Sequence, residues 1–272
     1  MWLPLFRANR TATESTVSVR HIAPAIARGI FLGLLVAGLS APQAFAGDEA
    51  ILATPDAGLL SANQPKRVDF GLESASNDAR KMAEWVVDSG DNRGMPFVIV
   101  DKRDARVFVF HADGRLRGAA PALLGLALGD DAVPGIGDRK LSSIRPNERT
   151  TPAGRFVAAL GRNMHGEEIL WVDYVTAISL HRVITTNPSE HRAQRLASPT
   201  LLDKRISYGC INVPVEFYER VVSPAFTGTN GIVYVLPEIR SLHEVFMSYG
   251  IGDVGHARLN ATARITAHFT EQ

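Results

Sequence analysis

The sequence predicts a mainly β fold with short flanking helices. Residues 97–100 and 106–110 are rich in Val and Phe and follow a two-residue period, and the turn-forming Ala112, Asp113 and Gly114 come next. The composition, 46% hydrophobic and 21% charged, is that of an ordinary globular protein with a sizeable core. The two runs therefore predict a hairpin that opens the domain.

The remaining elements follow the same reasoning. Further strands are expected at residues 122–128, 155–160, 167–172, 175–184 and 231–236, and the Gly/Pro/Asp-rich residues 129–152 predict a long surface loop. Apolar residues at helical spacing predict a short outer helix after Ser76 or Asn77, ending at Gly90. Pro214 opens a helix over 214–222, and another is expected at 242–249.

The first 46 residues have the pattern of a signal peptide. Arginines precede the apolar run at 29–39, which is short for a membrane span, and Ala44-Phe45-Ala46 is an A-x-A cleavage site. We expect export to the periplasm of a Gram-negative envelope and no stable membrane span after cleavage; an uncleaved anchor is the alternative. We expect residues 47–95 to form a linker and the short helix, 96–238 the main domain and 239–272 a tail.

The charge balance excludes one class of partner. Lys and Arg number 29 against 28 Asp and Glu, which gives a formal charge of +1, and the basic residues are scattered. A nucleic-acid surface needs a basic patch. No nucleic-acid partner is expected.

Cys210 is the only cysteine and lies in the motif Ser207-Tyr208-Gly209-Cys210-Ile211-Asn212. In an oxidising compartment a lone thiol is buried and inert, bridged to another chain, or reactive. A free thiol is only about 3% thiolate at neutral pH, so a nucleophile needs a nearby imidazole. Gly209 permits a sharp turn, after which the amides of Tyr208, Gly209 and Cys210 could form an oxyanion hole.

Two histidines compete as the base. His181 closes a predicted strand in which Ala177 and Ser179 share its face, leaving room for a cleft, whereas His191 lies in a polar, solvated stretch. A strand positions a base better than a loop does, which favours His181. The other histidines show no metal-ligand spacing, and neither metal nor cofactor is expected.

The motif resembles that of the L,D-transpeptidases of the YkuD type, which have a histidine, a spacer, and Ser/Thr-His-Gly-Cys followed by a hydrophobic residue and Asn or Arg. Upstream, Val100-Asp101-Lys102 and the run Thr151-Pro152-Ala153-Gly154-Arg155-Phe156 resemble two further family elements in the same order. The resemblance spans roughly residues 96–238. It implies a YkuD-like β-sandwich or barrel.

The resemblance also implies roles for individual residues. Cys210 would be the nucleophile, His181 its base, and the backbone carbonyl of Arg182 would orient the imidazole. The length of the spacer disagrees with the choice of His181 as the base. In this chain 25 residues separate His181 from Ser207, whereas 15 residues, the usual family gap, separate His191 from Ser207. If His181 is the base, residues 186–200 are an insertion relative to the family, which we expect to act as a lid or to contact substrate.

Five further residues complete the predicted site. Ser207 and Gly209 belong to the catalytic loop, Ser207 more as a turn residue than as a nucleophile. Tyr208 replaces the family histidine; it can donate a hydrogen bond but carries no charge near neutral pH. Asn212 is expected to cap the loop, hold it or contact substrate. Arg205 is our choice for binding a substrate carboxylate, among five nearby cations: Arg145, Arg149, Arg182, Lys204 and Arg205.

The resemblance implies a peptidoglycan L,D-transpeptidase that joins stem tetrapeptides at diaminopimelate or to another amine acceptor, in cell-wall biogenesis and cell shape. Its partners would be peptidoglycan stem peptides. The same site with water as acceptor would be an L,D-carboxypeptidase or another cysteine hydrolase. A catalytically silent wall-binding module is the remaining alternative, with Tyr208 as a mark of decay.

Overall fold

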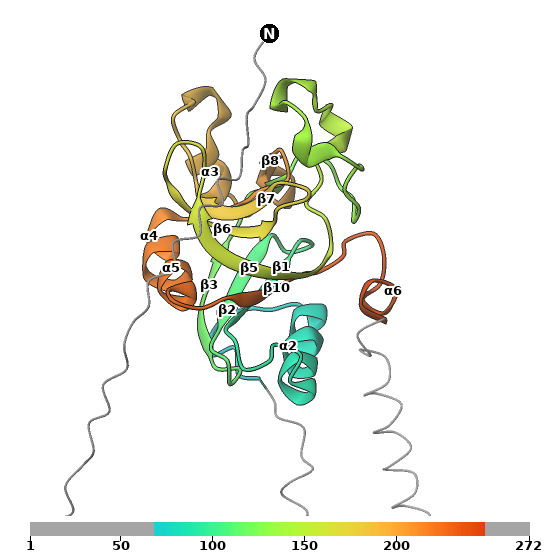
Figure 1. Cartoon of the computed structure of the whole chain (residues 1–272), viewed down its shortest axis with the longest axis vertical. Coiled ribbons are helices and arrows are strands. Elements are labelled where there is room, and N and C mark those ends of the chain that lie inside the picture. Colours follow the sequence, from blue (N-terminus) through green and yellow to red (C-terminus); the bar gives the residue numbers. More distant parts are fainter. Residues whose placement is uncertain (1–67, 248–272) are drawn as a thin grey trace, which may run out of the picture. The chain divides into compact units, whose positions relative to one another are not determined.

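The structure is a computed structural model that describes residues 68–247, all within one compact unit (Figure 1). The predicted signal peptide, most of the linker and most of the tail lie outside these residues. The strands are β1 (Phe97–Asp101), β2 (Arg106–Phe110), β3 (Leu116–Pro121), β4 (Leu124–Gly125), β5 (Gly154–Arg162), β6 (Glu168–Asp173), β7 (Ile178–Arg182), β8 (Arg205–Ser207), β9 (Ile211–Val213) and β10 (Gly231–Val235). The α-helices are α2 (Asn77–Ser89), α3 (Arg192–Ala197), α4 (Val215–Phe217), α5 (Ser223–Phe226) and α6 (Leu242–Phe246).

The mainly β class with short helices is confirmed. Eight strands form one mixed sheet in the order β3-β2-β1-β10-β5-β6-β7-β9. The two edges nearly meet, because Leu123, just after β3, exchanges backbone hydrogen bonds of 2.8 and 2.9 Å with Asn212 in β9. β4 and β8 pair in parallel beside this junction. The sheet is therefore almost a closed barrel.

Two apolar clusters hold the sheet from its two faces. Inside lie side chains of nearly every strand, including Val98, Val109, Leu170 and Ile211, all buried. Outside, α2 packs its buried Met82 and Val86 against Phe97, Ile99 and Phe108 of β1 and β2. Figure 1 shows α2, in cyan, beside this part of the sheet. Burial on both faces explains why β1 reads as a continuous apolar run.

The helix prediction for α2 holds in detail. The Ser76 side chain accepts a hydrogen bond from the Ala79 amide and caps the N-terminus, and Gly90 closes the helix in the left-handed conformation with φ 67°. The hairpin of β1 and β2 also forms as predicted, with Phe97 opposite Phe110.

Three element predictions need correction. The strand expected at 122–128 lies instead at Leu116–Pro121, and only Leu124–Gly125 of the predicted run is extended in a ladder. β7 begins at Ile178, because residues 174–177 form a turn. The helix predicted at 214–222 continues to Phe226 through a π-helical segment, η6 (Tyr218–Val222).

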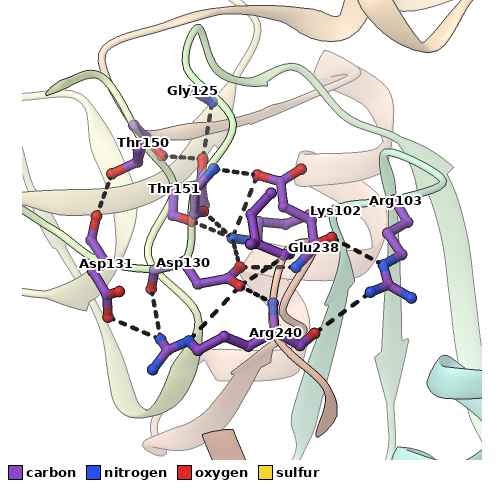
Figure 2. Close-up of polar contacts among 12 residues, drawn as sticks. Lys102, Arg103, Gly125, Asp130, Asp131, Thr150, Thr151, Glu238 and Arg240 are labelled. Carbon is purple, nitrogen blue, oxygen red and sulfur yellow. Dashed lines mark hydrogen bonds and ion pairs between the residues drawn. The ribbon is translucent and has the colours of Figure 1, made fainter. Parts of the chain in front are cut away.

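A buried polar cluster joins the long loop to the end of the sheet (Figure 2). The Nζ of Lys102, whose side chain is fully buried, donates to Asp130 Oδ1 at 2.8 Å and to the carbonyl of Thr151 at 2.8 Å. Asp130 in turn accepts the backbone amides of Glu238 and Arg240 at 2.8 and 2.7 Å. Residues 129–151 are thereby fixed where they cover the Cys210 loop.

Candidate active site

Cys210 stands in a tight loop between β8 and β9. The preceding Gly209 has φ 129°, and a Cβ on it would lie 2.6 Å from the carbonyl oxygen of Thr150 and 2.7 Å from Ile178 Cδ1. Only glycine fits this combination of backbone conformation and close approach. The predicted role of Gly209 in turning the chain before the thiol is therefore matched by the geometry.

Three side chains fix this loop by hydrogen bonds to its backbone. Ser207 Oγ donates to the Cys210 carbonyl at 2.6 Å and accepts the Gly209 amide at 3.1 Å. Thr151 Oγ1 donates to the Gly209 carbonyl at 2.8 Å. Asn212 Nδ2 donates to the Cys210 carbonyl at 3.2 Å. Ser207 thus holds the loop. Thr151 has the same role, which the sequence did not predict for it.

His181 reaches Cys210 from the neighbouring strand. β7 and β9 are parallel, with His181 opposite Asn212 and Leu180 opposite Ile211, so that the His181 side chain meets the residue just before β9. The imidazole interacts with the Cys210 thiol closely enough for each group to shift the pKa of the other. Its Nδ1 lies 2.7 Å from the carbonyl oxygen of Arg182. Because a carbonyl only accepts, Nδ1 carries the proton, which leaves Nε2 for the thiol.

Cys210 and His181 each shift the pKa of the other. Burial alone would raise the pKa of the Cys210 thiol, but the hydrogen bond and charge of His181 outweigh burial, and the pKa lies below its ordinary value. Burial alone would lower the pKa of His181, but the Cys210 thiolate and the Arg182 carbonyl outweigh it and raise that pKa. The two shifts together favour a thiolate–imidazolium pair.

Ser179 is a further contact of the thiol. Its Oγ donates to Cys210 Sγ at 3.5 Å, and it lies on the same strand face as His181. The Ala177 carbonyl lies 3.8 Å from Sγ, and Ala177 adopts a left-handed conformation with φ 55°. The alternation of β7 indicated that Ser179 shares the histidine face, which was the available signal for this residue.

A pocket of about 100 Å³ opens in front of Cys210. Its walls are the long loop, with Ile136, Ile144 and Thr150, the turn before β7 and the side chain of Tyr208. Another pocket, of about 480 Å³, lies along β7 and is lined by His181 and Arg182. His181 thus lines one pocket while contacting the thiol that opens into the other.

His191 lies apart from the thiol. It is exposed, precedes the short helix α3 and lines a separate pocket with Thr185 and Asn187. The stretch at 186–200 contains this helix and a 3₁₀ turn rather than an irregular loop. Of the two candidate bases, the structure brings His181 to Cys210.

Three site predictions are not supported by the contacts. Arg205 is bound to Glu238 and to the Lys102 carbonyl, with its side chain 9% exposed, so it does not reach substrate. Asn212 is fully buried and holds the loop instead of contacting substrate. The Gly209 amide is donated to Ser207, which leaves the amides of Tyr208 and Cys210 for an oxyanion.

Between residues 68 and 247, no group of three or more His, Cys, Asp or Glu side chains is arranged to hold a metal ion. In the same part of the chain, no helix is long and apolar enough to cross a membrane.

Comparison with known proteins gives matches among solved structures only: no family model and no curated protein matches the sequence. The helical cell shape determining protein Pgp2 from Campylobacter jejuni is 15% identical, over 58% of this chain and 55% of that one, with a TM-score of 0.38. An L,D-transpeptidase from Mycobacterium tuberculosis is 16% identical, over 52% and 57%, with a TM-score of 0.31. An Enterococcus faecium L,D-transpeptidase is 17% identical, over 52% and 50%, with a TM-score of 0.29.

The chain spans about half the length of each of these three proteins. At such identities and TM-scores the likeness by itself assigns neither a family nor an activity. The function proposed next rests on the geometry around Cys210.

Proposed function

We propose that this chain is a cysteine acyltransferase of the L,D-transpeptidase kind, acting on peptidoglycan stem peptides outside the cytoplasm. The observation that carries the proposal is the thiol of Cys210, whose pKa is lowered by His181, together with the Nδ1 of His181, which is held by the Arg182 carbonyl at 2.7 Å. A nucleophile, a base and a group that orients the base are the parts that acyl transfer needs. This arrangement counts against a decayed, silent site.

The chemistry follows from these parts. The Cys210 thiolate attacks the carbonyl that follows meso-diaminopimelate in a stem tetrapeptide, and the amides of Tyr208 and Cys210 are the proposed donors that stabilise the oxyanion. The carbon–nitrogen bond breaks as the His181 imidazolium donates its proton to the departing amine of D-alanine. A thioester remains. An amine from a second stem then attacks it, His181 accepts the amine proton, and the thiolate is released.

Product analysis tests the proposal. The chain from Gly47 onward is incubated with a disaccharide-tetrapeptide, and the products are separated and weighed by mass spectrometry. A cross-linked dimer with loss of D-alanine is the expected product. Tripeptide alone would make the enzyme an L,D-carboxypeptidase with water as acceptor. Equal product from the Cys210→Ala variant, or none from the unmodified chain, would refute acyl transfer at Cys210.

A further inference from the structure

The cations around the Cys210 motif differ in what they bind. Four of the five have partners within the fold. Arg145 pairs with Glu148 at 3.1 Å, Arg182 with Glu219 at 2.5 Å, Lys204 donates to the Leu196 carbonyl at 2.6 Å, and Arg205 pairs with Glu238. Arg149 is the fifth, and it has no carboxylate within ion-pair distance among residues 68–247.

Arg149 is nevertheless held in place. Its Cζ lies 3.9 Å from the centroid of the Tyr208 ring, and its Nε and Nη2 donate to the Ile144 carbonyl at 3.2 and 3.1 Å. The guanidinium is therefore fixed over the ring and half-buried. Both hydrogens of Nη1 have no acceptor in the described part of the chain. An oriented cation with unused donors fits an anionic ligand.

The guanidinium of Arg149 lies next to the pocket into which Cys210 opens. Ile144 and Tyr208, the two residues that fix the guanidinium, line the pocket into which Cys210 opens, as does Thr150, which follows Arg149 in the chain. The nearest carboxylate in sequence, Glu148, is already bound by Arg139 and Arg145. The unpaired guanidinium of Arg149 therefore contacts two residues that line the pocket of the thiol, whereas the arginine that itself lines the pocket, Arg139, is paired with Glu148.

We propose that Arg149, seated on Tyr208, binds the C-terminal carboxylate of the acyl donor. This inference rests on the proposed function, since a stem tetrapeptide ends in a D-alanine whose carboxylate is separated from the scissile carbonyl by one nitrogen and one carbon. A guanidinium that borders the Cys210 pocket suits a carboxylate so near the scissile carbonyl. The inference also gives Tyr208 a purpose: a neutral ring supports the cation, whereas an imidazole at this position would repel it whenever protonated.

The test measures binding without turnover. In the Cys210→Ala chain, calorimetry gives the Kd of a stem tetrapeptide with a free C-terminal carboxylate and of the same peptide ending in a carboxamide. Arg149→Gln should weaken binding of the carboxylate peptide about tenfold or more and leave the carboxamide peptide within about twofold. Arg145→Gln is the matched control, because Arg145 is exposed and Arg139 still holds Glu148. It should change neither Kd.

Tyr208 variants separate the ring from the hydroxyl. Tyr208→Phe keeps the platform and should bind both peptides as the parent does, whereas Tyr208→Leu should lose affinity for the carboxylate peptide. The inference is overturned if Arg149→Gln binds both peptides as the parent does, weakens both equally, or if the parent binds neither. If Arg149 discriminates the peptides but the unmodified chain yields no product, the carboxylate site stands and the transpeptidase proposal fails.

Discussion

Cys210 and His181 titrate as a pair, because each shifts the other. The pKa of the thiol is lowered and that of the imidazole is raised. The reactive thiolate–imidazolium state therefore forms as pH rises through the thiol pKa and is lost as pH rises further through the imidazole pKa. Activity should follow a bell-shaped pH profile whose two limbs belong to this pair.

Replacing the imidazole should move the thiol pKa upward. In His181→Ala, the largest contribution that opposes burial is lost and only weaker ones such as the Ser179 hydrogen bonds remain, so alkylation of Cys210 by iodoacetamide at pH 7 should slow by about tenfold or more, one pKa unit or more. The rate is followed by intact mass across pH 5 to 10. His191→Ala is the control and should match the unmodified chain. If instead His191→Ala slowed alkylation and His181→Ala did not, the base would be His191.

Gly209 should tolerate no side chain. Gly209→Ala combines a left-handed backbone, which costs about 1–2 kcal/mol, with overlap against the Thr150 carbonyl at 2.6 Å. Gly228→Ala is a matched control, because Gly228 has φ 75° and no atom within 4 Å of the added Cβ. Urea unfolding should show a larger loss of free energy of unfolding for Gly209→Ala. Equal losses would mean that the loop shifts freely to admit a methyl group.

At the scale of elements, the β7–β9 pairing creates the site and α3 adjusts it. Arg192, at the start of α3, donates from Nη1 to Asn212 Oδ1 at 2.8 Å, and Asn212 holds the Cys210 carbonyl. The Arg192 charge also disfavours the imidazolium of His181 and so lowers its pKa. Arg192, which lies in the predicted insertion at 186–200, is thus connected to the Cys210 loop through Asn212.

Removing the Arg192 charge should raise the pKa of His181. Arg192→Gln should therefore move the alkaline limb of the pH profile to higher pH. Arg195→Gln is the control, since Arg195 lies on the same helix but donates to the Glu190 and Asp203 carbonyls instead. The measurement is the pH dependence of product formation in the three proteins. An alkaline limb that stays in place, or moves to lower pH, would contradict the role given to Arg192.

At the scale of the molecule, the Lys102 cluster connects stability to the site. Burial alone would raise the pKa of Asp130, but the Arg240 amide and the Lys102 ammonium outweigh burial, and the pKa falls to about 2. A lowered carboxylate pKa stabilises the fold fully above its unfolded value, 3.8 here, and that stability is lost as pH falls toward 2.

Asp130→Asn should remove this contribution. We expect about 3 kcal/mol less free energy of unfolding at pH 7, because Lys102 loses a buried partner, and a flatter pH dependence between pH 4 and 2. Asp131→Asn, at a side chain 80% exposed, should cost under about 1 kcal/mol. Urea unfolding at several pH values measures both. An Asp130→Asn protein with the acid sensitivity of the unmodified chain would contradict the assignment.

Much of this was predictable from local patterns. The period-two runs of β1 and β2, the caps of α2 and the shared face of Ser179 and His181 are all visible in the sequence. β3 was misplaced because its residues, Leu116-Arg117-Gly118-Ala119-Ala120-Pro121, lack β-branched side chains. The more apolar residues after it are buried by pairing with β8 and β9, which no local pattern reports.

Long-range partners explain the errors in the site. Arg205 looked available because Glu238 lies far along the chain, and only the fold brings the two together. Asn212 could be assigned either to the loop or to substrate, because its burial and its contact with Arg192, which lies within the spacer, depend on the fold. Arg149 was one of five candidate cations, with Arg205 preferred, until the structure assigned partners to the other four. For Arg205 and Asn212 the deciding contact joins segments that are distant in sequence.

Intact mass after exposure to a carbapenem tests the central claim most directly. A β-lactam of this class presents a strained carbonyl to the nucleophile, and an activated Cys210 thiolate should open the ring and keep the acyl group. We predict one covalent adduct, mapped by peptide sequencing to Cys210 and absent from Cys210→Ala. An unmodified chain, or an adduct on any other residue, would contradict the assignment of Cys210 as the acyl-accepting nucleophile.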